Sequence, residues 1–289
     1  MVKPFLGRES RILITKNSYK RLTIATLSLS VIIAITAFSG CGTVSPGGKT
    51  GIITEAGSTT VQPLAEKFAA AFMLANPGIT VTIQGGGSGV GIKSANDGTV
   101  DIGAASRELN ADDPALNKIL VARDGIAIIV NNANAVTGLS KSQLADIYSG
   151  RIKNWGQLGG APGAIHVVAR EEGSGTRTAF QEMVMGKDLV VNTAILQSSN
   201  GSIRVTIAGD SRAIGFLSFG YADKEVKALA IDGVAATDQN ARTGKYPIVR
   251  PLYFLTRTQP TGIVKEFLDF CTGAEGQKIA IDEGYLAIK

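Results

Sequence analysis

Histidine, cysteine and tryptophan are nearly missing from this chain, whose 289 residues include one histidine, two cysteines and one tryptophan. A Cys/His metal cluster needs several such ligands, so we expect no metal of that kind and no cofactor. The one histidine, His166, lies in the apolar run AIHVVA, which predicts a strand residue rather than a catalytic base. Cys271 lies in the apolar pattern VKEFLDFC, which predicts a small buried side chain.

An excess of charge is also missing once the N-terminal region is set aside. The chain has 29 basic and 24 acidic residues; six basic residues and one acid lie in residues 1–40, so the remainder holds 23 of each sign. Proteins that bind nucleic acids usually carry a basic surface. The neutral remainder therefore argues against a nucleic-acid partner.

One long hydrophobic run is present, in residues 22–38 (LTIATLSLSVIIAITAF), behind the basic start of the chain. A basic start, an apolar middle and small residues before Cys41 are typical of a secretory signal. The cysteine after FSG resembles a bacterial lipoprotein signal, so we expect a signal peptide over 1–40, a lipidated Cys41 and a flexible tether over 41–50. That anchor would hold the protein on the periplasmic or cell-surface side of the cytoplasmic membrane. An uncleaved membrane anchor is the alternative, since this run nearly spans a bilayer.

Short apolar runs alternate with helical patterns from residue 51 to the C-terminus. This alternation predicts an α/β protein with largely parallel sheets. A first helix is expected over 60–76, where Asn76-Pro77-Gly78 ends the apolar periodicity. The length after the leader suits two lobes, with seams near residues 131–134 and 243–250.

Three segments share one pattern: a strand, then glycine and hydroxyl residues, then the start of a helix. They are residues 57–60 (GSTT), 86–89 (GGSG) and 173–176 (GSGT). Helix N-termini expose unpaired N–H groups and carry partial positive charge, while glycine lets the backbone approach a ligand. For one turn alone, simple helix capping is the better interpretation. Three such turns together favour an anion site.

Arg170 strengthens that interpretation, because it ends a predicted strand just before the third turn. A guanidinium can hold two oxygens of a tetrahedral anion at once. The alternative is a surface ion pair with Glu171 or Glu172. Arg177 also lies within reach of such an anion, although its place one turn into the helix can direct it to solvent.

Taken together, these segments resemble the phosphate-binding proteins of bacterial ABC importers, which are substrate-binding lipoproteins of the periplasmic-binding-protein superfamily. The resemblance runs from about residue 51 to the C-terminus and is carried by GSTTVQPLAEKF, QGGGSGVGIK, DIGAASREL, DGIAIIVN, DIYSGRIKNW, REEGSGTR and AIGFLSFGYA. It implies a two-lobed, type II fold with a mostly parallel sheet in each lobe and a two-strand hinge. The implied lobes are 51–130 plus 246–289, and 131–245.

The resemblance also implies a function and a set of ligand contacts. The protein would capture inorganic phosphate and deliver it to the permease and ATPase subunits of an importer. The implied phosphate-binding residues are Ser58, Thr59, Thr60, Ser88, Ser106, Arg107, Arg170, Ser174, Gly175 and Thr176. Glu172 matches the acid that orients the arginine, and Trp155 matches a packing residue.

One departure from the family pattern concerns the proton of hydrogen phosphate. The best-known pattern has an aspartate acceptor after the DxGAS segment, where this chain has Ser106 and Arg107. A serine both donates and accepts hydrogen bonds, whereas an arginine only donates. A buried acceptor is what rejects an anion without the proton, so selectivity for phosphate over sulfate is left open.

Three alternatives stay open beside a phosphate receptor. The site can belong to a receptor for another tetrahedral oxyanion, or to a phosphate-sensing lipoprotein. A hydrolase is the third, but Ser174 lacks the G-x-S-x-G elbow and no GxxxxGK[ST] loop is present. We therefore expect no enzyme activity.

Overall fold

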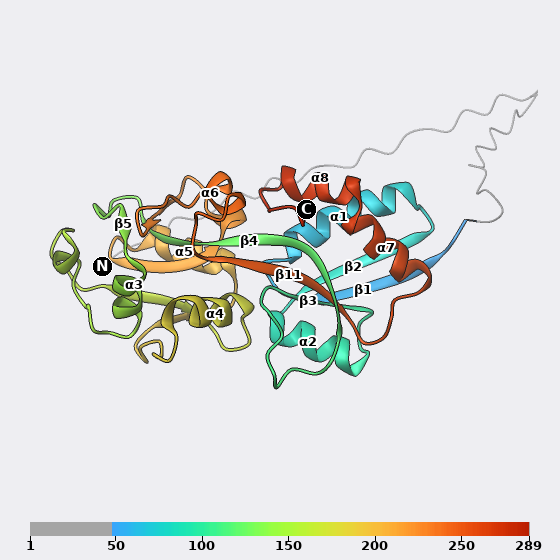
Figure 1. Ribbon diagram of the computed structural model, residues 1–289, viewed down its shortest axis with the longest axis horizontal. Coiled ribbons are helices and arrows are strands. Elements are labelled where there is room, and N and C mark those ends of the chain that lie inside the picture. Colours follow the sequence, from blue (N-terminus) through green and yellow to red (C-terminus); the bar gives the residue numbers. More distant parts are fainter. Residues whose placement is uncertain (1–47, 289) are drawn as a thin grey trace, which may run out of the picture. The chain divides into compact units, whose positions relative to one another are not determined.

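The computed structural model describes residues 48–288 (Figure 1). The predicted signal peptide, Cys41 and most of the predicted tether lie outside the described residues. No helix within residues 48–288 is both long and apolar enough to cross a membrane.

The first half of the chain builds a parallel sheet with helical crossovers. Its elements are β1 (Gly51–Gly57), α1 (Gln62–Ala75), β2 (Ile79–Gly85), α2 (Ser88–Asp97) and β3 (Ile102–Ala105). Strand β1 lies in the middle and pairs in parallel with β2 and β3. Pro63 in the first turn of α1 suits a helix start, and Gly98 ends α2 in the left-handed conformation. Apolar side chains of β1 and α1, such as Ile53 and Phe68, form the core.

Two long strands link this sheet to the second half of the molecule. They are β4 (Asn117–Asn131) and β11 (Val249–Thr256), which pair antiparallel with a register shift at Leu252/Tyr253. Figure 1 shows them side by side between the two groups of helices. Along β4, Ala122 packs in the first core and Ile126 in the second. Both strands therefore belong to both cores.

The second half contains another set of mostly parallel strands with helices. Its elements are α3 (Lys141–Tyr148), β6 (His166–Arg170), α4 (Gly175–Phe180), β7 (Ile195–Gln197), α5 (Asn200–Gly209), β8 (Ala213–Ser218), β9 (Val226–Ala228) and α6 (Asp238–Arg242), with β5 (Gly138–Leu139) and β10 (Ala230–Ile231) as a small separate pair. Strand β6 pairs in parallel with β7 and β8, while β8 and β9 run antiparallel to β4. Trp155 is buried in this core, as predicted.

The C-terminal helices return to the first half. They are α7 (Gly262–Thr272) and α8 (Ala274–Asp282), which pack near α1. Cys271 is buried there as a small apolar side chain, as predicted. The whole sheet has nine strands in the order β2-β1-β3-β11-β4-β8-β6-β7, with β9 beside β4. The α/β class and the two-strand link are confirmed, while the residue boundaries of the lobes stay a prediction.

Candidate functional site

The first predicted turn lies between β1 and α1, and its hydroxyls are not used to cap that helix. The helix is capped at Val61 without a side-chain hydrogen bond, and α1 begins at Gln62, two residues later than the sequence pattern predicted. Ser58 Oγ instead accepts from the Thr60 backbone N–H at 3.2 Å. Ser58 and Thr60 are both buried, which leaves the Thr60 side chain for contacts with other segments.

The second and third turns meet through their backbones. The Gly89 N–H donates to the Gly173 carbonyl at 2.9 Å. A Cβ placed on Gly175 would lie 2.2 Å from Ser88 Oγ and 2.7 Å from Ser106 Oγ. Real Cβ atoms essentially never come that close to other atoms, so a side chain at position 175 would displace Ser88 and Ser106.

Hydroxyl groups from separate segments surround this contact. Ser88 Oγ accepts from the Ser106 N–H at 3.1 Å and lies 3.4 Å from Ser106 Oγ. Thr60 Oγ1 lies 3.2 Å from Thr176 Oγ1. We call Thr60, Ser88, Ser106 and Thr176 the hydroxyl cluster. All four side chains are buried. Ser174, by contrast, accepts from the Arg177 N–H at 3.3 Å and so caps α4.

Arg170 is buried beside the cluster without a carboxylate partner. Its side chain is 1% exposed and donates to the carbonyls of Gln197 and Ser198 at 3.1 and 2.8 Å and to Thr59 Oγ1 at 3.4 Å. No acidic side chain of residues 48–288 forms an ion pair with it. Burial, and next the positive charge of Arg250, lower the pKa of Arg170 to about 10, so the group stays charged at neutral pH. A buried charge of this kind needs an anion nearby.

Two expectations for charged side chains do not match the observed contacts. The Arg107 guanidinium pairs with Asp113 at 2.5 Å rather than with a hydroxyl of the cluster. Glu172 is exposed, and carbonyl groups rather than this acid orient Arg170. The Arg177 guanidinium donates to the Arg170 carbonyl at 3.0 Å.

A second arginine, which the sequence patterns did not single out, contacts the cluster from β11. Arg250 donates to Thr60 Oγ1 at 3.1 Å and to Ser106 Oγ at 3.4 Å. It also pairs with Asp124 of β4 at 2.9 Å, and both side chains are fully buried. Burial raises the pKa of the Asp124 carboxyl, and the charge of Arg250 opposes that rise. The sequence signal that could have revealed this pair is a charged residue within each of two otherwise apolar strands, Asp124 in β4 and Arg250 in β11.

Asn200, at the start of α5, also contacts the hydroxyl cluster, and the sequence patterns did not predict this contact. Its Nδ2 donates to Thr60 Oγ1 at 3.0 Å, and its Oδ1 accepts from the Ser218 N–H at 3.2 Å. Nothing in the local sequence around Asn200 distinguishes it from an ordinary helix-start residue. The contact depends on the meeting of α5 with the first turn.

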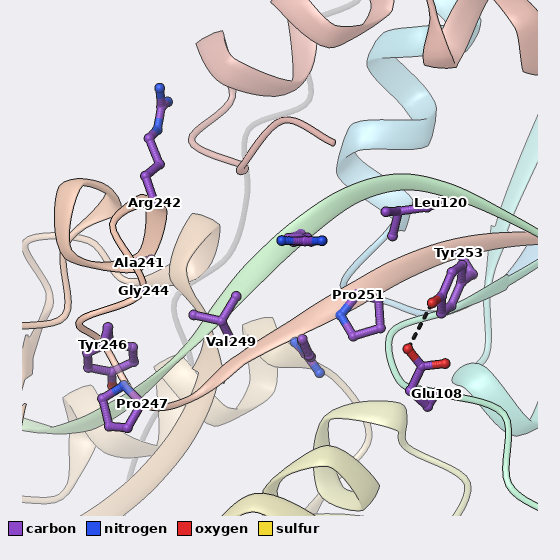
Figure 2. Close-up of a pocket in the computed structure, with 12 residues that line it drawn as sticks. Glu108, Leu120, Ala241, Arg242, Gly244, Tyr246, Pro247, Val249, Pro251 and Tyr253 are labelled. Carbon is purple, nitrogen blue, oxygen red and sulfur yellow. Dashed lines mark hydrogen bonds between the residues drawn. The ribbon is translucent and has the colours of Figure 1, made fainter. Parts of the chain in front are cut away.

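A separate cavity of about 500 Å³ lies beside the β4–β11 pair (Figure 2). Within it, the Tyr253 hydroxyl donates to Glu108 Oε1 at 2.8 Å. Its wall includes Arg250 but none of the ten predicted phosphate-binding residues. The cavity is therefore distinct from the hydroxyl cluster.

The cluster is suited to holding an anion rather than to nucleophilic catalysis. It combines hydroxyl and guanidinium groups, which donate hydrogen bonds to oxyanions. His166 pairs with Asp210 at 2.6 Å, at the opposite end of β6 from Arg170, roughly 13 Å away by the rise of a strand. His166 is a strand residue, as predicted. No group of acidic, histidine or cysteine side chains in residues 48–288 is placed to hold a metal ion.

Known proteins share both this sequence and this fold. Residues 44–275 match the family model described as the PBP superfamily domain. The phosphate-binding protein PstS of Bacillus subtilis strain 168 is 37% identical over 244 residues, which cover 82% of this chain and 81% of that protein. A putative phosphate ABC transporter substrate-binding protein from Clostridium perfringens, solved with bound phosphate, is 38% identical with a TM-score of 0.81. It aligns over 83% of this chain and 100% of its own. An ABC-type phosphate transport receptor from Vibrio cholerae is 35% identical, with a TM-score of 0.70 over 81% and 99% of the two chains.

Proposed function

Because the chain belongs to the PstS family of phosphate-binding proteins, within the PBP superfamily, we propose that it captures inorganic phosphate outside the cytoplasm for an ABC importer. The observation that carries this proposal is the buried, charged Arg170, which has no ion-pair partner in residues 48–288 and lies beside the hydroxyl cluster. A phosphate dianion would supply the missing negative charge and accept hydrogen bonds from the hydroxyls.

The proposed ligand contacts come from both halves of the chain. They are Ser58, Thr59, Thr60, Ser88, Ser106, Arg170, Ser174, Gly175 and Thr176. Arg107 is left out because its charge is already paired with Asp113. The first turn and α2 approach the anion from one side, and the segment after β6 approaches from the other.

We infer a binding cycle in which two lobes close around the anion. Residues 51–130 with 246–289 would form one lobe and residues 131–245 the other, and bending of β4 and β11 would open and close them. The closed protein would then dock on the permease subunits, whose ATPase drives release. A lipidated Cys41 would keep the receptor at the membrane surface. We expect no catalytic turnover, and hydrolysis of a chromogenic phosphate ester would contradict that expectation.

The direct test is calorimetric titration of phosphate into Arg170 variants. Arg170→Ala should weaken phosphate binding by about 10- to 150-fold, because a charge-assisted hydrogen bond is lost from a buried site. Arg170→Lys should recover only part of the affinity, since an ammonium cannot replace the planar guanidinium.

The matched control is Arg151→Ala, which removes an exposed arginine paired with Asp146 and Asp188. It should leave phosphate affinity unchanged. If the Arg170→Ala protein binds phosphate within about twofold of the parent, the proposed site is wrong.

A further inference from the structure

The orientation of the Asn200 amide is determined by its neighbour Ser218. The backbone N–H of Ser218 can only donate, and it lies 3.2 Å from the Asn200 side-chain oxygen. The amide oxygen must therefore face Ser218, which turns the NH₂ group toward Thr60. Asn200 is fully buried, so water does not compete for either bond.

Thr60 consequently has no remaining capacity to accept a hydrogen bond. A hydroxyl oxygen has two lone pairs and one hydrogen. Thr60 Oγ1 accepts from Asn200 Nδ2 at 3.0 Å and from Arg250 Nη2 at 3.1 Å. Neither of these groups can accept in return, so the Thr60 hydroxyl has to act as a donor.

Because Thr60 must donate, the hydrogen-bonding role of Thr176 is also determined. The two threonine hydroxyls lie 3.2 Å apart, and because Thr60 can only donate, Thr176 accepts. The hydrogen of the Thr176 hydroxyl then has no acceptor among residues 48–288. Thr176 is 1% exposed, so this buried hydrogen points to an acceptor supplied by a ligand.

We propose that Asn200 and Arg250 are positioning residues that make the Thr60–Thr176 hydroxyl pair an obligate donor to the bound anion. This inference rests on the proposed function, because it assumes that the anion occupies the hydroxyl cluster. It assigns a role in ligand specificity to two residues that belong to α5 and β11 rather than to the three turns.

The proposal has a consequence for selectivity. A donor at Thr176 serves any unprotonated anion oxygen, so it binds hydrogen phosphate and sulfate alike. An acceptor at the same position would bond the proton of hydrogen phosphate and repel sulfate, which has none. The amide of Asn200 therefore keeps this part of the site from discriminating between the two anions.

The test is the isosteric substitution Asn200→Asp, which should reverse the direction of the hydrogen bond between the Thr60 and Thr176 hydroxyls. Aspartate keeps the acceptor for the Ser218 N–H, and an acid at the first turn of α5 is compatible with the helix. The new carboxylate cannot donate to Thr60, so the Thr60 hydrogen turns toward that carboxylate. Thr176 then donates to Thr60, and the Thr176 lone pairs face the anion.

Phosphate and sulfate affinities are measured by calorimetry at mildly alkaline pH, where both anions carry two charges. The negative charge of the new aspartate weakens the binding of phosphate and of sulfate equally. The ratio of the two affinities therefore reports the hydrogen-bond direction alone. We expect the ratio to shift toward phosphate by about tenfold or more in Asn200→Asp, with no shift in the exposed control Asn132→Asp.

A second variant protects the test against a folding defect in the first. Thr176→Val removes the hydroxyl that donates to the anion, and it should weaken the binding of both anions by about tenfold without changing their affinity ratio. An unchanged affinity ratio in folded Asn200→Asp, or parental affinity in Thr176→Val, overturns the inference. Failure of the parent protein to bind either anion would instead reject the proposed function.

Discussion

Among individual residues, the buried charges of the site differ in how they are compensated. Arg250 has Asp124 as an ion-pair partner, whereas Arg170 has only carbonyl and hydroxyl oxygens among the described residues. An uncompensated buried charge destabilises a protein by several kcal/mol. In the proposed site, binding of an anion beside Arg170 would therefore add to stability as well as to function.

Glu55 is a buried acid that the proposed site does not use. It lies on β1 between Ile83 and Ile102 of the neighbouring strands and is 2% exposed. Its Oε2 has no hydrogen-bond partner in the described residues. Burial, and next the charge of Glu66, raise the pKa of Glu55 well above its ordinary value, so the folded protein holds this proton to higher pH than the unfolded chain.

Replacing this acid should stabilise the protein. Because the folded pKa is raised, the folded state binds more protons than the unfolded state, and stability falls as pH rises from about 4.5 toward the folded value. Glu55→Leu should remove that loss and increase the free energy of unfolding at neutral pH by about 1–3 kcal/mol. Urea denaturation between pH 4 and 8 measures the effect. The exposed control Glu182→Gln should change stability by less than about 0.5 kcal/mol, and an unstable Glu55→Leu protein would contradict the argument.

At the scale of single elements, the link strand β4 depends on a glycine. Gly125 pairs with Val249 of β11, and a Cβ at this position would lie 2.4 Å from the ring of Phe219. Phe219 packs against the second core from the segment after β8. The ring and the strand can be this close only because position 125 has no side chain.

Substituting this glycine should therefore destabilise the protein. Gly125→Ala forces the Phe219 ring or the strand to move, at a cost of about 1–3 kcal/mol in the free energy of unfolding. In a double variant with Phe219→Leu the two effects should be less than additive, because the clash is shared. Gly209→Ala, in open space on α5, is the control and should be neutral or stabilising. Additive effects in the double variant would count against the packing argument.

For the molecule as a whole, β4 and β11 carry both hydrophobic cores and the Arg250–Asp124 pair. The contacts between Thr60 and Thr176, and between Arg170 and Thr59, join segments more than a hundred residues apart. A ligand that strengthens these contacts would favour the arrangement in which both halves meet. Ligand binding should therefore make the protein more compact.

This linkage predicts two effects of phosphate on the intact protein. At a concentration about 100 times the dissociation constant, phosphate should add about 2.7 kcal/mol of stability and raise the melting temperature by roughly 5–10 °C. Small-angle scattering should also show a smaller radius of gyration with phosphate than without it. Chloride at equal ionic strength is the control. Absence of both effects with phosphate, sulfate and arsenate would reject an oxyanion receptor.

Sequence patterns were informative wherever a feature depends on neighbours along the chain. Apolar periodicity and turn residues predicted the alternating strands and helices, and the glycine and hydroxyl turns were found where β1 and β6 end. The motifs that carry the family resemblance are also local, and the family and fold that they implied are confirmed. Local rules work here because hydrogen bonds and side-chain periodicity within an element involve residues only a few positions apart.

Only the tertiary structure decided which polar groups meet. Arg250 reaches Asp124 across 126 positions of sequence, and Asn200 reaches Thr60 across 140. The tertiary structure also gave the Arg107 guanidinium a carboxylate partner, Asp113. Such partners are chosen by strand pairing and core packing, because a buried charge or amide must find its complement wherever the fold brings one within hydrogen-bonding distance.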